Sequence, residues 1–319
     1  MPPCSQGRLI LAAILALASG CSATRPSATD QFRVTVEVMP PETTAGLPVA
    51  ALIIGENTGP KRLWVPKVPA ISGATIRITV LTPSGEAISI EPVYPGFNPL
   101  LPNQVAPLEP GDARRVKEWI SFSYGHPEPF LTEPGRYEVR AGMKGPAWKW
   151  VDAEPVTFIV RAPEGRDAEA AKAYAPLMGE LEHAPDRFVN RKQGAVQIAE
   201  AIAREYGDTD YGKYSEYVRA RSLGALGEHE GAASAMEHLV EEGPPANIAL
   251  EARECLAYYH YRAGRLDEAE RIAEEIEAEG PPHPIAYYLY RLEWWINKAR
   301  KSRSDPPGSG SPSGADDGQ

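Results

Sequence analysis

Hydrophobic and polar side chains alternate along the first half of the chain. From Phe32 to Val38 every second residue is apolar, which is typical of a half-buried strand. A more continuous apolar run covers residues 49–54, as an inner strand requires. Proline and glycine separate such runs, and no helical period is present. The pattern therefore predicts short β-strands throughout residues 31–163.

The second half has a different period. After Arg166, alanine and glutamate become frequent, and the apolar residues between Gln193 and Tyr206 fall on one stripe of a helix. Glu-Gly-Pro-Pro occurs at residues 242–245 and again at residues 279–282, and Gly227 and Gly264 share the same offset. A fixed offset of this length predicts stacked helical hairpins over residues 167–300.

Both halves carry motifs of known families. Leu256-Ala257, Gly264, Ala269 and Pro281 resemble the tetratricopeptide repeat (TPR), although Arg253 stands where that family has tryptophan and the period is longer. The run from Pro134 to Tyr137 resembles the tyrosine corner of immunoglobulin-like sandwiches, which implies that the hydroxyl of Tyr137 reaches an upstream backbone group. The predicted fold has two domains: an all-β immunoglobulin-like sandwich followed by an all-α array of TPR-like helical hairpins.

The N-terminus has the parts of a secretory signal. Arg8 precedes an apolar run at residues 9–17 that is too short to span a bilayer. Ala18-Ser19-Gly20-Cys21 resembles the lipobox of bacterial lipoproteins, although the place usually held by leucine is Ala18. The resemblance implies a diacylglycerol on Cys21, and Ser22 favours the outer membrane with the protein facing the periplasm. The alternative is an ordinary signal peptide with Cys21 incidental.

These patterns divide the chain into five segments. Residues 1–20 are the predicted signal peptide, 21–30 a flexible tether, 31–163 the sandwich and 167–300 the helical array. Residues 301–319 are rich in Ser, Gly, Pro and Asp and are predicted to be disordered.

Charge and cysteine content narrow the classes of partner. The net charge is −10, with the acidic excess in the second half, which disfavours a nucleic-acid partner. The three cysteines do not form a disulfide framework, because Cys4 belongs to the signal peptide and Cys21 would be lipidated. The remaining Cys255 lies on the apolar face of a predicted helix and is expected in the core.

No motif predicts catalysis, a metal or a cofactor. The sequence has no His-Glu-x-x-His, Cys-x-x-Cys, Gly-x-Ser-x-Gly or phosphate-binding glycine loop. The first hypothesis is therefore a non-catalytic envelope lipoprotein, held on the membrane by its lipid, that binds a protein or peptide partner through its helices.

The residues expected to contact a protein or peptide partner are aromatic. In TPR-like arrays the first helices line a concave groove, which makes Tyr258, Tyr261, Tyr287 and Trp294 the candidate partner-binding residues. Tyr259, Tyr288 and Trp295 are expected to face inward. Trp148 and Trp150 either form an exposed platform or pack over the sandwich edge. The platform supports the alternative function, an envelope hydrolase or protease inhibitor with its site in the sandwich loops. In a third hypothesis the sandwich only spaces the array from the membrane.

Overall fold

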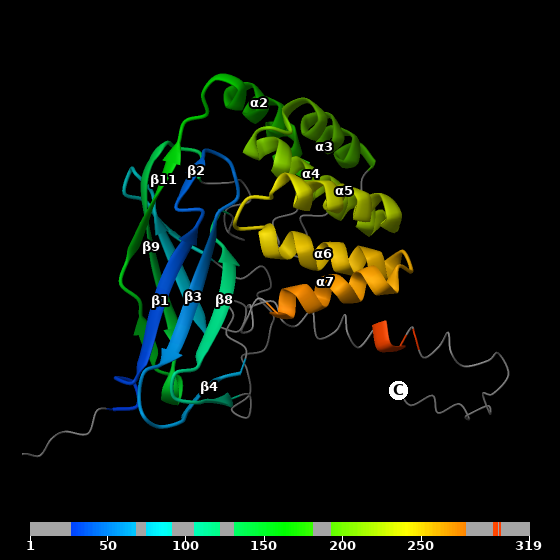
Figure 1. Cartoon of the computed structure of the whole chain (residues 1–319). Helices are drawn as coiled ribbons and strands as arrows, with labels where there is room; N and C mark the ends of the chain where they lie inside the picture. The colour runs from blue at the N-terminus through cyan, green and yellow to red at the C-terminus, as the bar shows by residue number, and fades with distance from the viewer. Residues whose placement is uncertain are drawn as a thin grey trace, which may run out of the picture.

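The computed structural model describes residues 27–67, 75–90, 105–121, 131–180, 193–278, 296–298 and 300. Strands occupy the N-terminal half and helices follow them (Figure 1). Cys21, Tyr287, Trp294, the predicted signal peptide and the predicted disordered tail lie outside these residues. Within the described residues, no helix is both long and apolar enough to cross a bilayer.

The strands form three sheets. One is antiparallel in the order β1-β3-β8, the largest has the order β2-β11-β9-β5-β6 with β10 also paired to β9, and β4 pairs with β7. The strands are β1 Phe32–Met39, β2 Glu42–Thr44, β3 Ala50–Asn57, β4 Leu63–Pro66, β5 Ile76–Leu81, β6 Ala87–Ser89, β7 Val105–Leu108, β8 Ala113–Trp119, β9 Gly135–Lys144, β10 Trp150–Asp152 and β11 Val156–Arg161.

The alternating strands bury one face each. In β1 the apolar residues from Phe32 to Val38 are buried and their polar neighbours exposed, as predicted. They share a core with residues of the largest sheet, among them Val139 and Phe158. The Tyr137 hydroxyl donates a hydrogen bond to the Glu133 carbonyl at 2.9 Å, which confirms the predicted corner. Residues from both larger sheets therefore build one β core.

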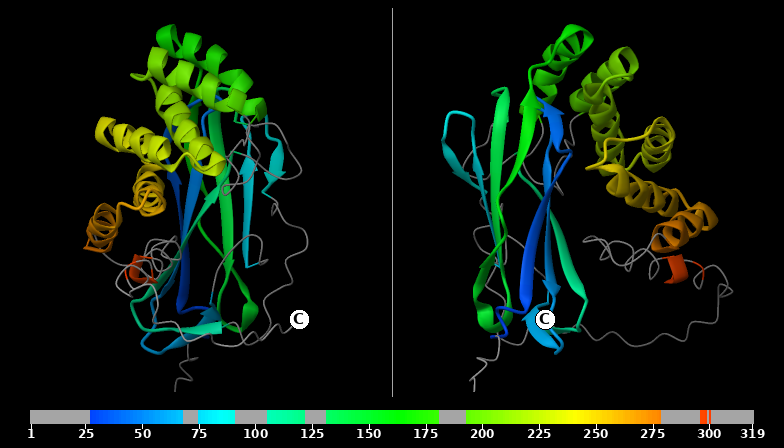
Figure 2. Two further views of the ribbon diagram at one scale, coloured as in Figure 1. Left: turned by 90° about the vertical axis from the view of Figure 1, so that its right-hand side faces the viewer. Right: turned by 60° about the vertical axis from the view of Figure 1, so that its left-hand side comes forward.

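Six α-helices follow among the described residues, and successive helices pack side by side along β3 and β8 (Figures 1 and 2). They are α2 Gly165–Glu180, α3 Gln193–Tyr206, α4 Asp210–Leu226, α5 His229–Glu242, α6 Ala249–Arg262 and α7 Leu266–Ala278. A short 3-10 helix, η1 Pro146–Trp148, lies between β9 and β10.

The predicted fold class is wrong. The described chain is a mixed α/β molecule with three sheets in its N-terminal half, not an all-β domain followed by a separate hairpin array. Leu47, Ala50 and Trp119 from the strand half belong to the same hydrophobic cluster as the buried residues of the helices. Sequence periodicity identified which face of each element is apolar, but it could not identify what covers that face.

Asn247 fixes the helices to the strand half through hydrogen bonds. Its side chain is buried, donates to the Pro48 carbonyl at 2.8 Å and accepts from the Tyr214 hydroxyl at 2.5 Å. Its backbone carbonyl accepts from the Lys117 ammonium group. Tyr211 adds a hydrogen bond to the Ala45 carbonyl at 2.6 Å. Because these groups are withdrawn from water, losing one partner would leave the other unsatisfied.

A buried cluster of ionisable side chains lies beside Asn247. The Lys117 ammonium group is 2.6 Å from the Glu251 carboxylate and 4.5 Å from the centre of the Trp119 ring. Glu254, one helical turn further along α6, is 6% exposed, and its Oε1 has no hydrogen-bond partner. Burial, and then the charge of Glu251, raises the pKa of Glu254 to about 8, against the attraction of Lys117. Glu254 therefore favours its neutral form in the folded protein near pH 7.

Candidate functional site

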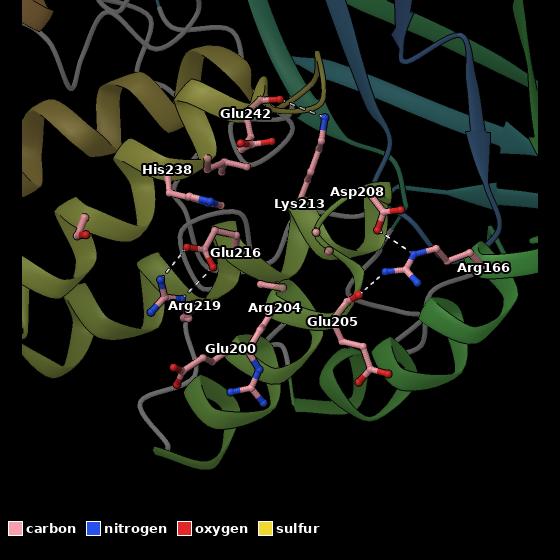
Figure 3. A pocket seen from close by; sticks show the side chains of 15 residues that line it. Arg166, Glu200, Arg204, Glu205, Asp208, Lys213, Glu216, Arg219, His238 and Glu242 are labelled. Carbon is pink, nitrogen blue, oxygen red and sulfur yellow. Dashed lines mark hydrogen bonds and ion pairs between the residues drawn. The ribbon is translucent and has the colours of Figure 1, made fainter.

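A charged groove of about 640 Å³ lies on the outer side of helices α3, α4 and α5. Figure 3 shows its charged side chains on the three helices and at the start of α2, with Arg219 directed at Glu216 and Arg166 at Asp208. Its ionisable lining residues are Arg166, Glu200, Arg204, Glu205, Asp208, Lys213, Glu216, Arg219, His238 and Glu242.

The turn between α3 and α4 forms one wall of the groove. Thr209 caps α4, and its hydroxyl accepts a hydrogen bond from the Gly212 amide at 3.1 Å. A Cβ atom on Gly212 would lie only 2.0 Å from the Tyr206 carbonyl oxygen. The absence of a side chain at Gly212 therefore allows the first turn of α4 to pass directly against the end of α3.

Some charges in the groove are neutralised within it. Arg219 donates two hydrogen bonds to the Glu216 carboxylate, at 2.9 and 2.7 Å, and these bonds raise the pKa of Arg219. Arg166 lies 2.9 Å from Asp208 and lowers the pKa of that carboxyl through a hydrogen bond. Lys213 donates to the Gly243 carbonyl at 2.9 Å. These three cations are held in place and shape the groove.

Other charged groups remain available to a ligand. Arg204, Glu200 and Glu242 are exposed, and their charged groups form no ion pair among the described residues. Figure 3 labels these side chains beside the paired groups of the same groove. Among the residues that the structure describes, the groove therefore offers an open cation, Arg204, and open carboxylates, which suits a ligand carrying charges of both signs.

Ser234, His238 and Glu242 follow one another at four-residue intervals on α5 and all line the groove. A hydrolytic triad requires a hydrogen bond from the nucleophile to its base and another from the base to an acid. No side-chain hydrogen bond joins these three in the part of the chain that the structure describes. The three residues therefore line the groove as separate polar groups.

The predicted tyrosines lie on α6, outside the groove. Tyr258 and Tyr261 are half-buried and pack against the helical core, and the Tyr258 hydroxyl accepts a hydrogen bond from Arg262 at 2.6 Å. Tyr259 is buried, as predicted. The role of Tyr258 and Tyr261 in partner binding stays a prediction.

Cys255 packs partly buried against the same core, as predicted. Burial raises the pKa of its thiol to about 11. The thiol therefore stays protonated near neutral pH and is poorly suited to nucleophilic chemistry.

Sequence reasoning missed the groove. Its charged residues come from several helices and share no motif, so only the packing of α3 against α4 and α5 brings them together. Gly207 and Asp208 line the groove together with residues of α5, and nothing in the sequence indicates this closeness. In the described part of the chain, no group of three or more His, Cys, Asp or Glu side chains could hold a metal ion.

No family model and no curated protein matches the chain. Solved structures that it resembles include the alkylpurine DNA glycosylase AlkC of Pseudomonas fluorescens bound to DNA containing an abasic site analogue, at 11% identity and a TM-score of 0.25, covering 41% of this chain and 31% of that one. The sporulation control protein Spo0M of Bacillus subtilis has 9% identity and a TM-score of 0.26, covering 46% and 56%. The chain therefore spans less than two thirds of either protein. Similarities this weak carry no functional argument.

Proposed function

We propose that this protein is a non-catalytic lipoprotein of the cell envelope that binds a segment of a protein partner in its charged groove. The observation that carries the proposal is the set of open charges: Arg204, Glu200 and Glu242 line a groove in which Arg219 and Arg166 are already paired with carboxylates. A segment with acidic and basic side chains would pair with both kinds of open charge.

The ordered setting of the groove supports the binding of a partner. The paired charges fix the walls, and Asn247 fixes the helices to the strand half. Binding to a site that is already ordered costs little conformational entropy. The lipobox-like sequence ending at Cys21 supports an anchor in the outer membrane, with the groove in the periplasm.

The test places a photo-crosslinking amino acid at Ser234 in the full-length chain in intact cells, and compares the wild type with Arg204→Glu. We expect one protein band in the wild type and its loss in the variant, since reversing the charge repels the acidic side chain of the partner. Lys172→Glu is the matched control, because Lys172 is exposed on α2 and does not line the groove. Equal crosslinking in all three proteins would contradict the proposed site.

The anchor is tested separately by labelling cells with palmitate. The wild type is expected to incorporate the label and Cys21→Ser to lose it. If both proteins remain unlabelled, the lipoprotein proposal is wrong whatever the groove binds.

A further inference from the structure

An aromatic and cationic surface lies at the end of the sheets where β1 begins. It consists of Trp64, Lys144, Trp148, Lys149 and Trp150, which we call the basal patch. Trp64 is 55% exposed and Trp150 is 36% exposed, and both are among the largest exposed apolar side chains of the described residues. β4, which carries Trp64, packs against η1, which carries Trp148. Exposed apolar groups gathered in one place mark a contact surface.

The backbone of η1 holds the patch in an unusual conformation. Ala147 and Trp148 both have positive φ, at 54° and 59°, a region that residues other than glycine seldom adopt. The Lys149 carbonyl accepts a hydrogen bond from the Gly145 amide at 2.9 Å, which closes this turn. The turn therefore presents Trp148, Lys149 and Trp150 together at the end of β9.

Cations lie over the aromatic rings of the patch. The Lys144 ammonium group is 5.6 Å from the centre of the Trp148 ring and 5.2 Å from that of Trp150, and the Arg77 guanidinium is 4.7 Å from the Trp150 ring. A sugar would need to stack on an open ring face, and these faces already carry cations. Tryptophan together with lysine is instead the combination that bilayer interfaces accommodate, where the ring lies at the level of the headgroups.

The patch also carries positive charge that is not neutralised. Asp152 pairs with Arg77, but Lys144 and Lys149 have no carboxylate partner among the described residues. Nearby Lys61 is exposed and likewise has no ion pair in this part of the chain. These lysines match the negative charge of anionic lipid headgroups.

The start of the chain lies beside the patch. The Phe32 ring packs directly on Gly145, so that a Cβ there would lie 2.6 Å from it, and the Gln31 side chain packs on Gly59 just before β4. Figure 1 shows β1 beginning at the end of the sheets where β4 lies. Residues 22–27 can span at most about 20 Å, because an extended chain covers roughly 3.5 Å per residue. A lipid on Cys21 would therefore keep the patch close to the bilayer surface.

We infer that the basal patch is a second membrane contact, which rests against anionic lipid headgroups while the acyl chains on Cys21 hold the protein there. The inference rests on the proposed lipid anchor. Two contacts fix the orientation of the molecule, whereas attachment through a single lipid-bearing residue leaves it free to rotate. The helices and their groove would then be held at a constant height and direction from the membrane.

The test uses lipidated full-length protein in vesicles of phosphatidylethanolamine and phosphatidylglycerol, with plain or brominated acyl chains. Bromine quenches only tryptophans at the bilayer. The tryptophan fluorescence of the wild type should be weaker in brominated than in plain vesicles. The triple variant Trp64→Phe, Trp148→Phe, Trp150→Phe should show no such difference. Ile159→Thr is the control, because Ile159 in β11 is 49% exposed and pairs with Arg136, far from the patch at the other end of β9. The variant should be quenched like the wild type.

A second arm uses unlipidated Cys21→Ser protein and vesicle flotation. We expect it to bind vesicles containing phosphatidylglycerol at low salt, to be released at high salt, and to bind more weakly after Lys144→Ser and Lys149→Ser. Equal emission from anchored wild type in plain and brominated vesicles would overturn the inference and leave the anchor intact. The inference would also be overturned if the wild type showed no quenching but sedimented with peptidoglycan, and the triple variant did not. That result would identify a glycan site instead.

Discussion

Glu254 allows a quantitative test of the packing between helices and sheet. Its carboxyl is buried without a partner for Oε1, and its pKa rises from 4.5 to about 8 in the folded protein. Between these two pH values the folded chain holds a proton that the unfolded chain has released. The free energy of unfolding therefore falls as the pH rises through this window.

The size of the effect follows from the pKa change. A rise of about 3.5 at 1.36 kcal/mol per pKa unit gives at most about 5 kcal/mol lost by pH 8. Glu254→Gln removes the titration and keeps the shape of the side chain. We expect the variant to gain on the order of 2 kcal/mol or more over the wild type at pH 8, and little at pH 5.

The assay is urea unfolding of the full-length chain at the two pH values. Glu277→Gln is the matched control. Because Glu277 is exposed on α7, this substitution should change the free energy of unfolding only slightly, and by the same amount at both pH values. If the gain from Glu254→Gln is the same at pH 5 and pH 8, Glu254 is not neutral in the folded protein and the reasoning fails.

Three further predictions concern stability and are checked by urea unfolding. Asn247→Ala should cost about 2–4 kcal/mol, because it leaves two buried groups without their hydrogen bonds; a cost under about 0.5 kcal/mol would contradict its role. Gly212→Ala should destabilise by about 1–3 kcal/mol, because a Cβ meets the Tyr206 carbonyl, whereas Gly194→Ala, with open space in α3, should stabilise by about 0.5–1 kcal/mol. Similar effects at the two glycines would refute the steric argument. Tyr137→Phe should cost about 1 kcal/mol for its lost hydrogen bond, and an unchanged midpoint would show that the corner is unimportant.

Sequence patterns predicted single elements well. The helix expected from Gln193 to Tyr206 has those bounds as α3. The glycines that share one offset, Gly227 and Gly264, both have positive φ, at 88° and 83°; Gly227 directly follows α4, and Gly264 follows α6 after Ala263. Left-handed residues end helices and favour glycine, so these signals are local and can be recognised in sequence.

Contacts between distant elements were not predictable in the same way. Nothing around Lys117 or Trp119 indicates that helices cover β8, and Glu254 resembles any solvated acid of an amphipathic helix. The groove depends on the distance between α4 and α5, and its charges resemble an ordinary polar surface. Such features arise from packing, which a single sequence specifies only through the whole fold.

The shared cluster of Leu47, Ala50 and Trp119 with the helices has a mechanical consequence. A partner pulling on the groove would not stretch a hinge between two loosely joined bodies. The load would pass through Asn247 and Lys117 into β8 and β3, and from there into β1. Under tension the helices and the strand half would therefore move together as one stiff unit.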